Sequence, residues 1–297
     1  MPDYLTHFES LRPRLYGIAY RMLGSRADSE DVLQEAWLRL RRKDSMQFRS
    51  AEAWLVTTVT RLCIDRLRAL RVQRRHYVGC WLPEPLIGDV AENVERAADA
   101  SADLSMAFLV MLEKLAPEER AAFLLHEVLD CDYSELSQIL GKNQVTCRQI
   151  VSRARKRVRA GSTAAPAAVE QQRELLERLV HALQTENKPE LLQLVAKDAC
   201  WTSDGGGKVP AALKVVRGGE RVVRFATAVL SRHIRQSELK ITSVNREPAL
   251  ALESAGKLIS VITLHAHQGQ IREFFSVRNP QKLASGVPSQ SMCGRCC

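Results

Sequence analysis

The spacing of apolar residues changes part-way along the chain, and this change constrains the fold more than any other feature. Up to residue 160 apolar residues recur at intervals of three and four, as in Leu11, Leu15, Ile18 and Met22, which is the period of helices that bury one face. Runs typical of strands appear only later, at 239–244, 249–253, 258–267 and 271–277, and Gln268-Gly269-Gln270 predicts a hairpin turn between the last two. The sequence therefore predicts a multidomain protein, an all-α part followed by an α+β part with antiparallel strands.

Two segments without helical period divide the chain further. Residues 76–103 contain several Gly and Pro residues, and residues 161–169 are small and uncharged, as in a linker. A chain of 297 residues is also long enough for two or three domains. We expect helical domains at 1–75 and 104–160, an α+β domain at 170–284, and a disordered tail at 285–297.

Charge and hydropathy narrow the class of protein. The formal charge of +9 permits a nucleic-acid partner but does not prove one. The start of the chain lacks the features of a signal peptide, and apolar runs such as 106–112 fall far short of the roughly 20 residues of a membrane span. Five cysteines are scattered singly and are expected to be reduced. These features predict a cytoplasmic protein with no membrane partner.

Residues 133–159 predict a helix-turn-helix unit. A short helix at 133–140 is followed by a turn at Gly141-Lys142 and by a second helix with six basic residues and no acid between 148 and 159. The front of such a second helix faces base edges, and basic residues along it neutralise phosphates. The candidate DNA contacts are Gln144, Thr146, Arg148, Gln149, Arg153 and Arg155. The alternative is a helical hairpin with a solvated basic face, which the lack of offsetting acids disfavours.

A second basic cluster lies at the end of the helix expected from residue 51 onward. Residues 66–75 hold five arginines and no acid, more than a helix C-terminus requires. Upstream of it, the spacing of Trp54 favours a core position over base stacking. An acidic segment precedes both, and there Asp28 is the expected N-cap, with Asp31 in the first turn.

Three of these segments together resemble one family. DSEDVLQEAWLRL (28–40) resembles the helix by which bacterial sigma factors of the extracytoplasmic-function (ECF) class bind core polymerase. AWLVTTVTRLCIDRLR (53–68) looks like the family's next segment, which melts and reads the −10 promoter element, and residues 133–159 are similar to its −35-reading domain. The resemblance implies a protein that makes no bonds itself and positions RNA polymerase core on promoter DNA.

The resemblance also implies roles for individual residues. The polymerase-binding residues would be Asp28, Glu30, Asp31, Gln34, Glu35 and Trp37, and the −10 contacts would be Trp54, Arg61, Asp65, Arg66 and Arg68. The helix-turn-helix residues given above would read the −35 element.

Three short motifs narrow the resemblance to one subgroup. YVGCWLPEPL (77–86), DGGGK (204–208) and NPQKL (279–283) resemble signatures of ECF sigma factors with a fused C-terminal SnoaL-like domain of NTF2-like fold. Cys80 stands where the subgroup typically has proline, and Gln281 where aspartate is usual. The motif residues with an implied regulatory role are Trp81, Leu82, Pro83, Asp204, Gly205, Gly206, Gly207, Lys208, Asn279, Pro280, Lys282 and Leu283. We expect this domain to regulate the sigma domains in cis, with no separate anti-sigma factor required.

Other functions of the C-terminal domain stay open at this point. Its candidate acid/base groups are Asp204, His233, His265 and His267. His265 and His267 share a strand face, but spacing supplies no third metal ligand, so we expect ordinary strand histidines and no metal or cofactor. The Gly triplet predicts a turn or a close backbone approach.

Two rival functions follow from these alternatives. One is a ligand-responsive repressor that uses the same helix-turn-helix, with an unknown small ligand in the C-terminal domain. The other is a SnoaL-like enzyme with an appended DNA-binding module. The ending CGRCC (293–297) has three thiols but no nearby fourth zinc ligand, and a dispensable tail is favoured over a redox sensor.

Overall fold

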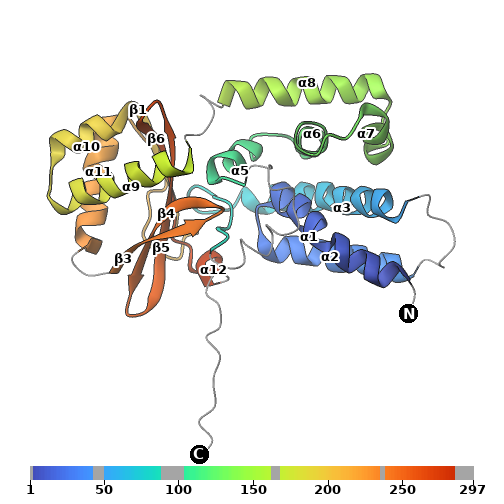
Figure 1. Ribbon diagram of the computed structural model, residues 1–297, viewed down its shortest axis with the longest axis horizontal. Coiled ribbons are helices and arrows are strands. Elements are labelled where there is room, and N and C mark those ends of the chain that lie inside the picture. Colours follow the sequence, from blue (N-terminus) through green and yellow to red (C-terminus); the bar gives the residue numbers. More distant parts are fainter. Residues whose placement is uncertain (1–2, 43–49, 88–103, 162–167, 235–237, 285–297) are drawn as a thin grey trace, which may run out of the picture.

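The computed structural model describes residues 3–42, 50–87, 104–161, 168–234 and 238–284. A helical body and an α+β domain lie side by side (Figure 1). The expected 285–297 tail, with its cysteines, and the 88–103 part of the expected linker lie outside the described residues.

The N-terminal helices begin at serine caps. Helices α1 (Asp3–Leu23), α2 (Arg26–Arg41) and α3 (Ala51–Arg74) pack on one another. The Ser25 hydroxyl accepts the N–H of Asp28 at 3.3 Å, and the Ser50 hydroxyl accepts that of Ala53 at 3.2 Å. The prediction that Asp28 caps α2 was therefore wrong. Gly24, with a φ of +64°, ends α1 and brings Ser25 into the extended conformation of a cap.

The second group of helices has the predicted helix-turn-helix. Helices α5 (Met106–Leu112) and α6 (Pro117–Phe123) precede it, and α6 continues into a π-helical turn (Leu124–Val128). Helix α7 (Tyr133–Leu140) ends at Gly141, whose φ of +65° suits a glycine cap, and α8 (Gln144–Gly161) follows.

The two helical groups share one hydrophobic core. Buried residues of α1–α3 and of α5–α8 form a single cluster, to which Leu55, Val59, Leu124 and Val151 belong. Helix α3 contacts both α6 and α7, and it lies beneath them in Figure 1. The two domains expected to read separate promoter elements are thus packed directly together.

The C-terminal domain has helices and a mixed sheet. Its elements are α9 (Val169–Gln184), α10 (Lys188–Leu194), β1 (Val195–Asp204), β2 (Val216–Arg217), α11 (Gly219–Ile234), β3 (Glu238–Val244), β4 (Glu247–Ser254), β5 (Lys257–His267), β6 (Gln270–Val277) and α12 (Pro280–Leu283). The strand order is β2-β1-β6-β5-β4-β3. Gln268 and Gly269, both with positive φ, form the predicted hairpin turn between β5 and β6.

Strand β1 departs from the sequence prediction. No strand was expected before residue 239, but helix α10 ends at Leu194 and residues 195–204 form a strand. The sheet is also not wholly antiparallel as expected, because β1 runs parallel to β6. The exposed pair Lys197 and Asp198 interrupts the alternation of apolar and polar residues in β1. The segment therefore lacks the period of two by which a strand is predicted from sequence.

Both faces of the sheet are covered, but by different parts of the chain. Side chains such as Leu250, Ile262 and Phe274 pack with helices α9–α11. Their neighbours along the strands point the other way, where Val261, Phe275 and Val277 form a second cluster. That cluster also contains Leu82 of the 77–87 segment, Met106 of α5 and Leu283 of α12. The helical body and the segment 77–87 therefore cover the second face.

Candidate nucleic-acid interface and interdomain junction

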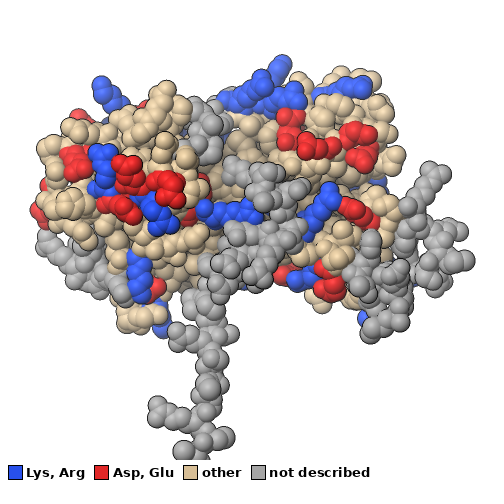
Figure 2. All heavy atoms as spheres, in the orientation of Figure 1, with Lys and Arg blue, Asp and Glu red and all other residues tan. Residues whose placement is uncertain are grey.

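The predicted −35 contacts form an outward face of α8. Gln144, Arg148, Gln149 and Arg153 are exposed, and Thr146 is half-buried. The opposite side of α8, including Cys147, Ile150, Val151 and Ala154, is buried. In Figure 2 basic side chains gather along the upper edge, over α8, with acidic side chains beneath them. This face is accessible as the chain stands.

Some of the basic charge of α8 is offset from other elements. Arg155 pairs with Glu127 at 2.5 Å, and Arg157 pairs with Glu119 at 2.6 Å. The expectation that no acid offsets these charges holds within 148–159 but not in the fold. Arg155 is thus engaged, whereas Arg148 lies over the ring of Tyr133, 5.0 Å from its centroid.

The arginines predicted to hold the −10 strand are all bound within the protein. Arg61 donates from Nε to the carbonyl of Ile139 and from a terminal nitrogen to that of Gln138, both at 2.8 Å. These carbonyls end α7, where a cation is stabilised by the helix dipole. Arg68 pairs with Glu118 of α6 at 2.8 Å and with Asp65 at 3.0 Å.

Arg66 is bound within the first group of helices. Its Nε donates to Asp28 at 2.7 Å. A residue predicted to contact the −10 element is thus paired with a residue predicted to bind polymerase. Asp28 is accordingly only 13% exposed. Trp54 packs partly buried against the core, as its spacing indicated.

The remaining predicted polymerase contacts lie mostly outward on α2. Asp31 and Gln34 are exposed. Glu30 pairs with Arg12 at 2.5 Å, and Glu35 with Arg39 at 2.8 Å, on the surface. Trp37 turns inward against Phe8, with ring centroids 4.9 Å apart.

The three motifs of the C-terminal resemblance meet at one carboxylate. Asp204 is fully buried at the end of β1. It accepts hydrogen bonds from the Tyr77 hydroxyl at 2.6 Å, the Leu82 N–H at 2.9 Å and the Lys282 ammonium at 2.7 Å. One residue of DGGGK thus holds two residues of the 77–86 motif and one of the 279–283 motif. We call this cluster of Tyr77, Leu82, Asp204 and Lys282 the junction.

The junction is an ion pair inside the protein. Burial lowers the pKa of Lys282 to about 8, although Asp204 acts to raise it. Burial, together with the hydrogen bond to Asp204, raises the pKa of Tyr77. The ammonium also donates to the Leu82 carbonyl and lies 4.1 Å from the ring centroid of Trp81. Removing one partner of such a buried pair leaves an uncompensated charge, which is strongly destabilising.

The glycine triplet permits a close approach of backbone to the junction, as predicted. A Cβ on Gly206, whose φ is +59°, would lie 2.3 Å from Nδ2 of Asn279, and that amide donates to the Tyr77 hydroxyl at 2.9 Å. A Cβ on Gly205 would lie 2.5 Å from the Val209 carbonyl oxygen. The remaining motif residues differ in their exposure. Pro280 begins α12, Leu283 and Pro83 are buried, and Lys208 is exposed.

A second anchor, which sequence reasoning missed, holds the other end of this segment. Asn245 is buried in the turn between β3 and β4. It accepts the N–H of Leu86 at 2.7 Å through its side chain and donates its own N–H to the Leu86 carbonyl at 2.9 Å. Its amide nitrogen also donates to the Leu104 carbonyl at 3.0 Å. Asparagine between two strand-like runs, in a position that favours positive φ, was the available signal.

The helical body contacts the segment 77–87 from the side opposite the sheet. The Glu84 carboxylate accepts the N–H of Arg26 at 2.8 Å, and the Tyr20 hydroxyl donates to the Glu84 carbonyl at 2.5 Å. Trp81 lies under the Arg74 guanidinium at 3.4 Å and so close to Gly24 that a Cβ there would be 2.9 Å away. Residues 77–87 are therefore held between the two bodies, and we call them the clamped segment.

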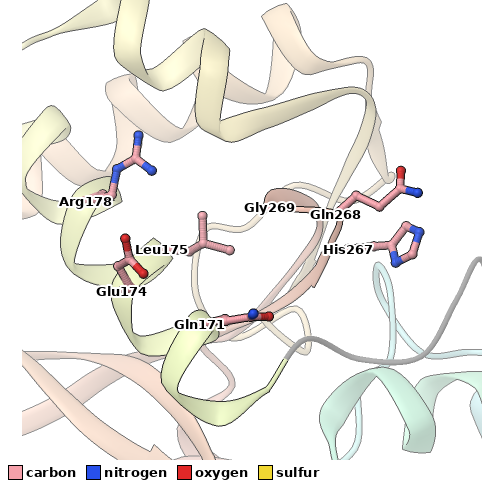
Figure 3. A pocket seen from close by; sticks show the side chains of 7 residues that line it. All are labelled: Gln171, Glu174, Leu175, Arg178, His267, Gln268 and Gly269. Atoms are coloured by element: carbon pink, nitrogen blue, oxygen red, sulfur yellow. The ribbon is translucent and has the colours of Figure 1, made fainter.

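The candidate acid/base groups of the C-terminal domain do not gather in one site. His267 lines a pocket of about 450 Å³ between α9 and the β5–β6 hairpin, opposite Glu174 and Arg178 (Figure 3). His265 is buried and is not part of that lining, Asp204 belongs to the junction, and the side chain of His233 lies outside the described residues. Within the described ranges no three His, Cys, Asp or Glu side chains form a metal-binding group.

Among the helices that the structure describes, none is both long and apolar enough to cross a bilayer.

Comparisons with known proteins decide the family. Residues 7–73 match the family model of Sigma-70 region 2, and residues 105–158 match that of Sigma-70, region 4. The ECF RNA polymerase sigma factor SigJ of Mycobacterium tuberculosis is 38% identical over 235 residues, which cover 77% of this chain and 74% of SigJ. The chain belongs to the ECF RNA polymerase sigma factors. The family resemblance drawn from the three helical motifs is confirmed.

Other matches extend the likeness over most of the chain. The probable ECF sigma factor SigI of Mycobacterium tuberculosis is 28% identical over 270 residues, or 85% of this sigma factor and 90% of SigI. The crystal structure of Mycobacterium tuberculosis SigJ superposes with a TM-score of 0.77 at 31% identity, covering 96% of this chain and 99% of that one. The predicted fold class is confirmed as two helical sigma domains followed by an α+β domain.

Proposed function

We propose that this sigma factor brings RNA polymerase core to promoter DNA in the cytoplasm and that its C-terminal domain controls this step in cis. Residues 1–75 would bind polymerase and the −10 element, and residues 104–160 would bind the −35 element. The domain at 170–284 would control how readily the two sigma domains move apart, so that no additional anti-sigma factor is needed.

The observation that carries this proposal is the engagement of Arg61 by α7. Its guanidinium bonds to two carbonyls of the helix-turn-helix unit, so the expected −10 surface is covered by the expected −35 reader. The −10 and −35 promoter elements are separated by about 25 base pairs, roughly 85 Å of duplex at 3.4 Å per pair. Both readers can engage one promoter only after they separate, and the arrangement in Figure 1 is therefore a closed one.

The C-terminal domain supports the closed arrangement through the clamped segment. This segment leaves α3 and leads toward α5, so it belongs to the connection between the two sigma domains. Asp204 holds it near its start and Asn245 holds it near its end. Separation of the readers requires this connection to be free to extend, and these bonds oppose that extension. The domain would thus act as an intramolecular inhibitor that is released when polymerase or another signal breaks the junction.

The rival functions explain less. The Sigma-70 region 2 match disfavours a repressor that works without polymerase. The enzyme hypothesis uses Asp204 as a catalytic group, but this carboxylate is fully buried and already accepts three hydrogen bonds. We propose that the C-terminal domain has no catalytic role.

Run-off transcription with core polymerase tests the regulatory proposal. The Asp204→Asn variant keeps the size of the side chain but removes the charge that holds Lys282, and we expect several-fold more transcript than from the unaltered protein. Asp198→Asn is the matched control, because Asp198 is exposed on the same strand and pairs with Arg272 on the surface at 3.1 Å. Equal transcript from both variants, with folding intact by circular dichroism, would contradict the proposal.

A further inference from the structure

A pocket rich in arginine lies where the two sigma domains meet. Its volume is about 270 Å³, and it is lined by Arg71, Arg74 and Arg75 at the end of α3 and by Glu113 and Arg120 from the opposite domain, with three apolar side chains completing the wall. The arginines of α3 belong to the basic cluster at 66–75 but are not among the predicted −10 contacts. The pocket exists only while α3 lies against α5 and α6.

The pocket has more positive charge than the protein neutralises. A single carboxylate, that of Glu113, pairs with both Arg120 at 2.7 Å and Arg74. Four guanidinium groups therefore share one carboxylate in the lining. Burial lowers the pKa of Arg74, and the nearby charge of Arg120 acts in the same direction. Such an excess, partly removed from water, favours a bound anion.

Donors in the pocket are also left without acceptors. Arg120 is 3% exposed, and its Nε is buried with no hydrogen-bond partner within the described residues. At the mouth, Arg75 is exposed and makes no side-chain hydrogen bond or ion pair in the described part of the chain, and Arg71 makes a single long bond of 3.4 Å to the Leu115 carbonyl. Buried guanidinium donors are ordinarily paired, so the Arg120 Nε points to a missing acceptor. The exposed guanidinium groups of Arg71 and Arg75 lie at the mouth, where they could contact the same acceptor.

We propose that this pocket binds a small anion carrying phosphate groups, of the size of inorganic diphosphate or the diphosphate of a nucleotide. Guanidinium groups match phosphate oxygens in bidentate geometry, and several of them around one cavity suit more than one phosphate. The volume suits a small anion. Arg120 is 3% exposed, so the backbone of a DNA duplex could not reach it.

The bound anion would join the two sigma domains. Arg71 and Arg75 come from α3, and Arg120 comes from α6, so one ligand would be held by both. Occupancy would then favour the closed arrangement increasingly as the ligand concentration rises above its Kd. The site goes beyond the proposed role of the C-terminal domain, because the anion would bind whether or not Asp204 controls transcription.

Titration calorimetry on the full chain, in a buffer free of phosphate, tests the site directly. Inorganic diphosphate should bind with a stoichiometry of one. The Arg71→Gln/Arg75→Gln variant should bind it at least about tenfold more weakly, since it loses two charge-assisted contacts. Both residues are exposed, so this variant should keep its melting temperature without ligand. Arg173→Gln, on the exposed face of α9, is the control and should bind like the unaltered protein.

Further titrations distinguish the sources of the anion. Equal affinity for inorganic diphosphate and for a nucleoside diphosphate would assign recognition to the phosphates alone, and tighter nucleotide binding would assign the site to a nucleotide; either supports the proposal. No binding at millimolar diphosphate, unchanged affinity in the double variant, or equal affinity for sulfate would overturn it. Loss of promoter binding in the double variant, with no diphosphate binding by the unaltered protein, would assign these arginines to DNA instead.

Discussion

The basic surfaces of α3 and α8 are similar in sequence but differ in the structure. Each is a helix with arginines and few acids nearby in sequence. On α8, Arg148 and Arg153 are exposed and ready for DNA. On α3, Arg61 and Arg68 are bound by the domain that carries α8. Residue type can therefore indicate which ligand a surface binds, whereas tertiary contacts decide whether the surface is exposed to that ligand.

The largest expected effect comes from breaking the junction that keeps α3 covered. Asp204→Ala leaves the Lys282 ammonium buried without its counter-charge and the Leu82 N–H and Tyr77 hydroxyl without an acceptor. We expect the free energy of unfolding to fall by about 3–5 kcal/mol. Urea denaturation measures it. The Asp198→Ala control should stay within about 0.5 kcal/mol, and an equally small loss at Asp204 would show that the junction does not stabilise the closed form.

Substitutions on the exposed face of α8 should affect DNA binding even while the two sigma domains stay packed together. Arg148→Ala should weaken binding of full-length protein to a −35 duplex by about 1–3 kcal/mol if the side chain reads a base. Arg153→Ala should weaken binding to all duplexes more uniformly. Fluorescence anisotropy with matched and scrambled duplexes measures both. A uniform loss for Arg148→Ala would make it a phosphate contact.

The junction should also give stability a particular pH dependence. The pKa of Lys282 is lowered to about 8 in the folded protein, against an ordinary value of about 10.4. Between these values the unfolded chain binds more protons at this group than the folded chain does, so its contribution to stability rises with pH, by at most about 1.4 kcal/mol per pH unit.

Thermal unfolding between pH 8 and 10 measures this contribution by comparing unaltered protein with Lys282→Met. The slope of stability against pH should be less positive in the variant, while Lys257→Met, at the exposed start of β5, should keep the original slope. Identical slopes in all three proteins would contradict the burial of a charged Lys282 at the junction.

The smallest effect is expected at the edge of the covered surface. Glu118 pairs with Arg68 of α3 and, at 3.3 Å, with Lys142 of the helix-turn-helix turn. Glu118→Gln should lower stability by no more than about 1 kcal/mol, because these pairs are partly exposed. It should still speed hydrogen exchange of amides near Arg61. Unchanged exchange would mean that Glu118 adds nothing to the contact between the domains.

Much of this fold could be predicted because it depends on local pattern. Helical period, Gly141 and the run of basic residues together predicted α7 and α8, and the Gln268-Gly269 turn predicted a hairpin. The prediction failed where local and tertiary preferences differ. Strand β1 exposes Lys197 and Asp198 in its middle, and the cap of α2 depends on the conformation of Gly24 rather than on the acid at 28.

The candidate site was predicted as a set of residues but not as an arrangement. The three C-terminal motifs gave Asp204 and Lys282, and the structure brings them within 2.7 Å. The hydrogen bond between Arg61 and Ile139 joins residues 78 positions apart in the sequence. The residues adjacent to either partner in the sequence give no sign of this contact. Asn245 was overlooked for a related reason, since its importance comes from the distant residues Leu86 and Leu104.

The distance between α3 and α8 in solution tests the central claim most directly. Fluorescent labels on non-natural residues at Ala69 and Ser152, both exposed, would report it by single-molecule energy transfer. We predict one short distance in the full-length protein, a second and longer population in Asp204→Asn, and only the long distance with core polymerase and promoter DNA. A single short distance in Asp204→Asn, identical to that of the unaltered protein, would contradict control of the closed arrangement by the junction.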